Sequence, residues 1–172
     1  MFDIRSEYLL SENNMALIFE GKSECFLCNK VLTSDTPYQG FPAFVCNEND
    51  ELFVFSDSGV HIDCVNAAPN GAKANRYADE FIKFTRPENR KCVVTGELIT
   101  RYEDHIFIEY LTSDETSLLH QFNFTNIHRN NISQWEGRLQ LLSLLFSLKE
   151  SDSWKNYYAQ RYLSKLIDSI TI

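Results

Sequence analysis

The sequence predicts an α+β fold made of two small tandem units followed by a C-terminal helix. Two pairs of metal-ligand residues, each pair with a spacing of two intervening residues, frame a segment in which two apolar runs flank a polar turn. A helix-like pattern follows the second pair, and the same order of features recurs 67 residues later. Apolar runs around a polar turn are typical of a β-hairpin, and self-similarity at a fixed offset indicates a duplicated unit.

The ligand pairs are Cys25 with Cys28 and His61 with Cys64. A Cys-x-x-Cys turn brings two thiolates to one ion, and side chains three residues apart in a helical turn share one face. The four residues therefore predict one tetrahedral zinc ion per chain. Since protein would fill all four positions, no position is left for water or substrate, and the ion would stabilise the fold rather than catalyse. The alternative is that these cysteines are buried as small apolar residues, as we expect for Cys46.

The segment between the ligand pairs predicts a hairpin. FPAFVC and ELFVFSD are the apolar runs, NEND is the turn, and Pro69-Asn70-Gly71 divides the following helix into two pieces. A cysteine knuckle, a hairpin and a helix that carries the last two ligands resemble a treble-clef zinc finger over residues 23–84. The segment is also similar to the first half of a LIM-type zinc module, but it lacks the further Cys pair. The resemblance therefore implies a single zinc ion.

The second copy lacks two of the four ligands. With the offset of 67 residues, Cys25, Cys28, His61 and Cys64 correspond to Cys92, Thr95, His128 and Asn131. The apolar positions also correspond: Val31, Leu32, Leu52, Phe55 and Val60 fall on Leu98, Ile99, Leu119, Phe122 and Ile127. Thr and Asn do not replace thiolates at a zinc site, so we expect the second copy to be free of metal. The alternative is two unrelated α+β segments with chance spacing.

Packing is expected to stabilise the second copy in place of an ion. Its predicted helix, residues 132–150, is apolar around most of its circumference and is therefore expected to be central. The apolar residues are Leu139, Leu141, Leu142, Leu145, Phe146 and Leu148. A last helix begins at a cap, Ser151 or Asp152, and carries an aromatic stripe of Trp154, Tyr158 and Tyr162 that is more typical of a core than of a contact surface.

These features divide the chain into four parts. Residues 1–22 form an N-terminal packing segment, 23–89 the zinc-binding treble-clef-like unit, 90–149 the degenerate metal-free repeat, and 150–172 the C-terminal helix. Five cysteines, an odd number, argue against a closed disulfide framework. The N-terminus does not resemble a signal peptide and no apolar run has the length of a membrane span, so we expect a cytoplasmic protein.

The distribution of charge favours a protein partner over a nucleic acid. Residues 1–66 contain 3 Lys or Arg and 11 Asp or Glu, whereas the remainder contains 13 of each sign. Phosphate binding requires a basic surface, so no nucleic-acid partner is expected. The predicted hairpin tip gathers Glu48, Asp50 and Glu51, which we expect to face a basic protein. The alternative is that the acidic residues only keep the protein in solution.

The preferred function is a non-catalytic, zinc-stabilised acidic protein-binding module, for example an inhibitor or an immunity-type protein of a basic partner. The alternative is a worn HNH-like nuclease, because HNH nucleases are also treble clefs. That resemblance implies catalytic or metal-binding roles for Asp104, His105, Asn123 and His128 in the second copy. The incomplete cysteine pair and the acidic surroundings argue against this alternative.

Overall fold

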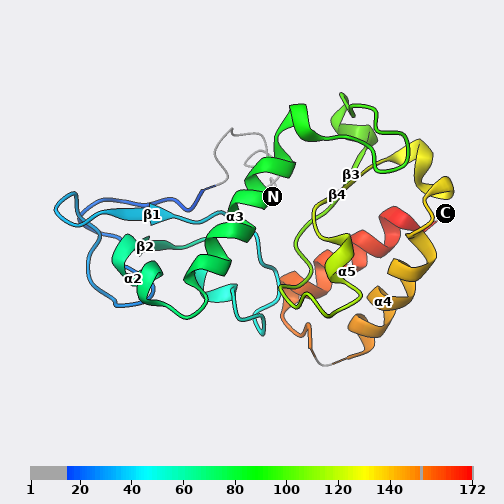
Figure 1. The fold of residues 1–172 in the computed structure, drawn as a ribbon. Helices are drawn as coiled ribbons and strands as arrows, with labels where there is room; N and C mark the ends of the chain where they lie inside the picture. The colour runs from blue at the N-terminus through cyan, green and yellow to red at the C-terminus, as the bar shows by residue number, and fades with distance from the viewer. Residues whose placement is uncertain (1–14, 152, 172) are drawn as a thin grey trace, which may run out of the picture. The chain divides into compact units, whose positions relative to one another are not determined.

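The computed structural model describes residues 15–151 and 153–171 (Figure 1). It is an α+β fold with two small β-hairpins, several helices and a C-terminal helix pair. The chain divides into two compact units, of which the first contains residues up to Phe44 together with Val54–Ala78. The second contains Val45–Phe53 and the residues from Asp79 onward. In the described part of the chain, no helix combines the length and the apolar character needed to cross a membrane.

The hairpin of the first unit is shorter than predicted. Strand β1 (Tyr38–Gly40) pairs antiparallel with β2 (Gly59–His61), and Tyr38 lies opposite His61. The prediction that FPAFVC and ELFVFSD are strands is wrong, since residues 41–58 connect the two strands. A 3₁₀ helix, Phe53–Phe55, and a left-handed backbone at Asp57 (φ 54°) interrupt the extended conformation there.

The apolar residues of this connection are buried without strand pairing. The ring centroids of Phe41 and Phe55 lie 5.4 Å apart, and those of Phe41 and Phe44 lie 6.5 Å apart. All three side chains are buried in the first unit. An alternating or continuous apolar run reports burial, and here an aromatic cluster in a loop provides that burial.

Two helices follow β2, as the Pro-Asn-Gly break predicts. Helix α2 (Ile62–Ala67) ends before Pro69, and α3 (Gly71–Thr85) begins at once. Glycine is required at the start of α3, because a Cβ atom on Gly71 would lie 1.8 Å from the carbonyl oxygen of Val65. The predicted division of the helix is therefore confirmed. The boundary between the compact units falls within α3.

Residues 15–22 pack against the first hairpin. The Ala16 N–H donates to the Phe41 carbonyl at 3.0 Å, and the Gly21 N–H donates to the Leu32 carbonyl at 2.8 Å. Ile18 is so close to Gly59 that a Cβ atom there would lie 3.0 Å from its Cδ1. The preceding EYLL run, which was also predicted to pack, lies outside the described residues.

The second unit contains the other hairpin and the C-terminal helices. Strand β3 (His105–Ile108) pairs antiparallel with β4 (Thr125–His128), and His105 lies opposite His128. Helices α4 (Arg138–Glu150) and α5 (Tyr157–Ile170) pack side by side (Figure 1). The buried core joins apolar residues of all four elements: Ile106, Ile108, Ile127, Leu141, Leu145, Leu163, Leu166, Ile167 and Ile170.

Helix α4 differs from the prediction in position and in surroundings. It begins at Arg138, and residues 129–134 before it form a 3₁₀ helix. Leu141 and Leu145 are fully buried, whereas Leu139 is 72% exposed and Phe146 is 49% exposed. The expectation of a central helix is therefore wrong, because α4 buries one face only.

The last helix is capped later than predicted. The side chain of Asn156 accepts a hydrogen bond from the Ala159 N–H, which makes Asn156 the N-cap of α5. Trp154 is buried just before the helix, and its ring stacks on Tyr162 with centroids 6.2 Å apart. Tyr158 is exposed, so the predicted stripe is only partly core.

The two hairpin segments share a hydrogen-bond pattern at an offset of 67 residues. Matching backbone N–H to carbonyl bonds, written donor to acceptor, are Cys25 to Lys30 and Cys92 to Glu97, Leu32 to Ser23 and Ile99 to Arg90, Phe26 to Gly59 and Val93 to Asn126, Asp57 to Pro42 and Phe124 to Glu109, and Ala74 to Asn70 and Leu141 to Gly137. Residues at matching positions also share the left-handed backbone, with φ of 54° at Asp57 and 57° at Phe124. The agreement extends from the knuckle to the helix after the hairpin.

A buried carboxyl group makes the second unit sensitive to pH. Burial raises the pKa of Glu109 to about 7. An acid whose pKa is higher in the folded chain destabilises the fold as the pH rises above its ordinary value of 4.5, and the penalty is complete above about pH 7. Glu109→Gln should therefore raise the free energy of unfolding at pH 8 by about 1–3 kcal/mol, and by less at pH 5.

Tryptophan fluorescence during urea unfolding measures this effect, because both tryptophans, Trp135 and Trp154, belong to the second unit. Glu97→Gln, at an exposed position of the same unit, is the control and should show no comparable pH dependence. A Glu109→Gln protein with the same stability as the original at both pH values contradicts the burial of this carboxylate.

Candidate metal centre

A hydrogen-bonded turn positions the first two cysteines. The Cys25 N–H donates to the Lys30 carbonyl at 2.8 Å, and the Asn29 N–H donates to the Cys25 carbonyl at 2.8 Å. Asn29 has a left-handed backbone (φ 57°), which asparagine tolerates better than most residues. An isolated β-bridge between Glu24 and Val31 closes the base of the turn. This knuckle holds the Cys25 and Cys28 thiols on one side of the turn.

The second pair comes from the junction of β2 and α2. His61 is the last residue of β2, and Cys64 lies in the first turn of α2. Two hydrogen bonds tie this junction to the knuckle: the Phe26 N–H donates to the Gly59 carbonyl at 3.1 Å, and the His61 N–H donates to the Cys25 Sγ at 3.4 Å. The hairpin therefore places the two pairs together.

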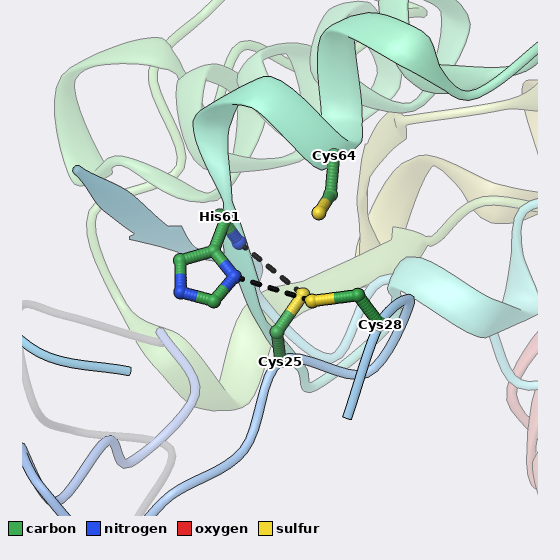
Figure 2. Close-up of side chains that lie close together, drawn as sticks. All are labelled: Cys25, Cys28, His61 and Cys64. Carbon is green, nitrogen blue, oxygen red and sulfur yellow. Dashed lines mark hydrogen bonds between the residues drawn. The ribbon is translucent and has the colours of Figure 1, made fainter. Parts of the chain in front are cut away.

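The four side chains converge from these two segments (Figure 2). One ligand atom from each of Cys25, Cys28, His61 and Cys64 lies within 4.8 Å of the other three. Cys25 and His61 are buried, whereas Cys28 and Cys64 are partly exposed. The group thus has a buried half on the core of the first unit and an open half through which an ion can enter. The predicted ligand set is one cluster in the structure.

The imidazole of His61 presents Nδ1 to the thiols. This nitrogen lies 3.5 Å from the Cys28 Sγ, and Figure 2 shows the other ring nitrogen on the side away from the sulfur atoms. Nδ1 is therefore the ligand atom that an ion would meet. The neutral tautomer with its proton on Nε2 would leave Nδ1 free to coordinate.

The thiol protons of the cluster are unequally held. Burial raises the pKa of Cys25, but backbone N–H groups of His61 and of the knuckle donate to its sulfur and bring the pKa to about 6. Hydrogen bonding with Cys28, together with burial and the nearby Cys25, raises the pKa of Cys64 to about 11. The cluster therefore favours one thiolate, and three thiolates at this separation require a cation between them.

The donor set fits zinc. Tetrahedral zinc with zinc–sulfur distances of about 2.3 Å places its sulfur ligands about 3.8 Å apart. The separations of up to 4.8 Å need only a small contraction to reach that geometry. Three thiols and one imidazole are typical of structural zinc, and all four positions would come from the protein. Such an ion would contribute folding free energy to the first unit.

The acidic residues expected to face a partner lie in the second unit, apart from the ligand cluster in sequence and in structural unit. The Tyr110 hydroxyl donates to both carboxylate oxygens of Asp50 at 2.9 Å, and Asp50 also accepts from the Leu52 N–H. The Ser113 hydroxyl donates to Glu51 at 2.9 Å. These bonds hold the segment Val45–Phe53 within its unit. Glu48 is exposed.

The four residues of the nuclease alternative are only partly brought together. His105 and His128 are strand partners, and the His128 Nε2 lies 3.9 Å from an Asp104 oxygen. Asn123 is engaged elsewhere, since its side chain accepts from the Leu111 N–H and donates to the Thr112 carbonyl.

A residue that sequence reasoning missed is Asn126, which is buried and hydrogen-bonded to His105 at 2.5 Å. His128 in turn uses Nδ1 to accept from the Asn130 N–H and caps the 3₁₀ helix after β4. Only the register of the strands, which the sequence pattern did not reveal, places Asn126 beside His105.

Comparison of the chain with models of protein families, with curated proteins and with solved structures gives no significant match. The metal centre therefore stands on its own residues: the spacing of the ligands, the knuckle and the distances within the cluster.

Removal of one ligand should abolish zinc binding. Cys28→Ala leaves three ligands and should lower the zinc content well below one ion per chain, with unfolding of the first unit, because structural zinc supplies folding free energy. The matched control is Thr95→Ala, the corresponding position of the second copy, which should retain one zinc. Cys46→Ala, a truncation against the second core, should also retain zinc and cost about 1–2 kcal/mol.

Elemental analysis of protein purified under reducing conditions measures the zinc content, and far-ultraviolet circular dichroism follows the melting. Equal zinc content in the Cys28→Ala and Thr95→Ala proteins would show that Cys28 is not a ligand.

Proposed function

We propose that the protein is a non-catalytic protein-binding module whose first unit is held together by one structural zinc ion. The observation that carries this proposal is the closed ligand set of Cys25, Cys28, His61 and Cys64. A zinc ion that already has four protein ligands offers no position for a substrate or a reactive water. The module would therefore act through its surface, and the ion through the conformation it stabilises.

We further propose that the chain consists of two treble-clef-like copies that arose by duplication, with zinc in the first only. The matching hydrogen bonds at an offset of 67 residues support this interpretation. Local turns occur widely, but the bond from Phe26 to Gly59 and its counterpart from Val93 to Asn126 join segments far apart in each copy. Two unrelated segments would not be expected to share such long-range pairs as well as the turns.

The partner is proposed to be a basic protein, as for an inhibitor or an immunity-type protein. The support is electrostatic, since the chain has a formal net charge of −8 and acidic residues recur in the segment Val45–Phe53. Charge of one sign accelerates the capture of a partner of the other sign. Glu48 and Glu51 are exposed there, while Asp50 contributes to the structure through Tyr110.

Reversal of charge in this segment should slow association. Glu48→Lys with Glu51→Lys is the informative variant, and Asp50 is left unchanged because its bonds to Tyr110 hold the segment. Glu88→Lys with Glu97→Lys, two exposed acids elsewhere in the second unit, is the control with the same change in net charge. Affinity capture from the native host supplies the partner, and association rates are then measured by stopped flow at several salt concentrations.

The first variant should associate more slowly than the control, and the difference should be largest at low salt, where screening is weakest. Equal rates for the two variants would contradict this binding face. The nuclease alternative is tested separately: cleavage of DNA or RNA with a divalent metal that His105→Ala abolishes would support that alternative, and we expect no cleavage.

A further inference from the structure

The second knuckle keeps the geometry of the metal centre around a single cysteine. The Cys92 N–H donates to the Glu97 carbonyl at 2.8 Å, and the Gly96 N–H donates to the Cys92 carbonyl at 2.7 Å. An isolated bridge between Lys91 and Leu98 closes the turn, as between Glu24 and Val31 in the first copy. The thiol of Cys92 therefore has the same backbone support as that of Cys25.

The strand that follows also approaches the sulfur in the same way. The His128 N–H donates to the Cys92 Sγ at 3.4 Å, the distance found between the His61 N–H and the Cys25 Sγ. One donor is different: the Asn131 side-chain amide lies 3.6 Å from the Cys92 Sγ and donates to it. Asn131 occupies the position that corresponds to Cys64, so a hydrogen-bond donor stands where the first copy has a metal ligand.

We propose that Cys92, Thr95, His128 and Asn131 are a former zinc site in which the Asn131 amide stabilises the Cys92 sulfur as an ion would, and that two thiols suffice to restore zinc binding. The inference rests on the duplication proposed above and is independent of any partner. The imidazole of His128 now caps the following 3₁₀ helix through Nδ1, and it would turn to the sulfur atoms when an ion binds.

The charge state of Cys92 agrees with this proposal. Burial raises its pKa, but hydrogen bonds from the His128 backbone, the Asn131 side chain and the knuckle backbone together bring the pKa down to about 7. Cys92 is only 2% exposed, and burial without such donors would favour the neutral thiol. The pocket thus retains the preference for a thiolate, which is the form that binds zinc.

The direct experiment restores the ligands. Thr95→Cys with Asn131→Cys produces a Cys₃His set at Cys92, position 95, His128 and position 131, and should raise the zinc content from one to two ions per chain. Native mass spectrometry under reducing conditions gives the stoichiometry, and the thiolate-to-cobalt absorption of the cobalt-substituted protein should double. Thr100→Cys with Asn130→Cys adds two thiols to exposed positions of the same unit and should leave the zinc content at one.

A folded Thr95→Cys/Asn131→Cys protein that binds a single zinc ion would overturn the proposal. A second measurement applies even if that variant does not fold. Asn131→Ala should raise the pKa of Cys92, followed by the ¹³Cβ chemical shift of labelled cysteine, by about half a pH unit or more. Asn130→Ala should leave it unchanged. A Cys92 pKa that is the same in the Asn131→Ala protein and the original would contradict the role given to the amide.

Discussion

The structure of the first unit depends on the close approach of three thiols and one imidazole. Their ligand atoms lie within 4.8 Å of one another, a separation at which three thiolates repel strongly unless a cation is present. The knuckle, the register of β1 with β2 and the start of α2 all determine this arrangement, since each carries a ligand or a backbone donor to Cys25. One zinc ion would therefore join three segments that have few other buried contacts to hold them.

The second unit shows how the same backbone can be stable with a different interior. Its knuckle keeps the turn and the sulfur of Cys92, but an amide from Asn131 takes the place of a ligand. A larger core, which includes Leu141, Leu145 and the apolar face of α5, packs behind the hairpin. Burial of apolar side chains contributes about 1.5–3 kcal/mol each, so a few such residues are comparable with the free energy that a structural ion supplies.

Local chemistry was predictable from the sequence, and long-range packing was not. The four ligands follow from their spacing, and the break before α3 follows from Pro69 and Gly71. The apolar run after β1 predicted strands, yet Phe41, Phe44 and Phe55 reach the same burial as a loop cluster, which apolar pattern alone does not distinguish. No local signal links Asp50 to Tyr110, because their bond joins positions 60 residues apart. The acidic tip therefore acquired a structural role that its sequence does not indicate.

Backbone hydrogen exchange with and without a zinc chelator tests the central claim most directly, because the two copies provide matched amides. The Leu32 N–H donates to the Ser23 carbonyl in the first copy, and the Ile99 N–H donates to the Arg90 carbonyl at the corresponding position of the second. If zinc holds the first unit alone, the chelator should abolish protection at Leu32 and leave Ile99 protected. Protection that survives at Leu32, or that is lost equally at both amides, would contradict this account.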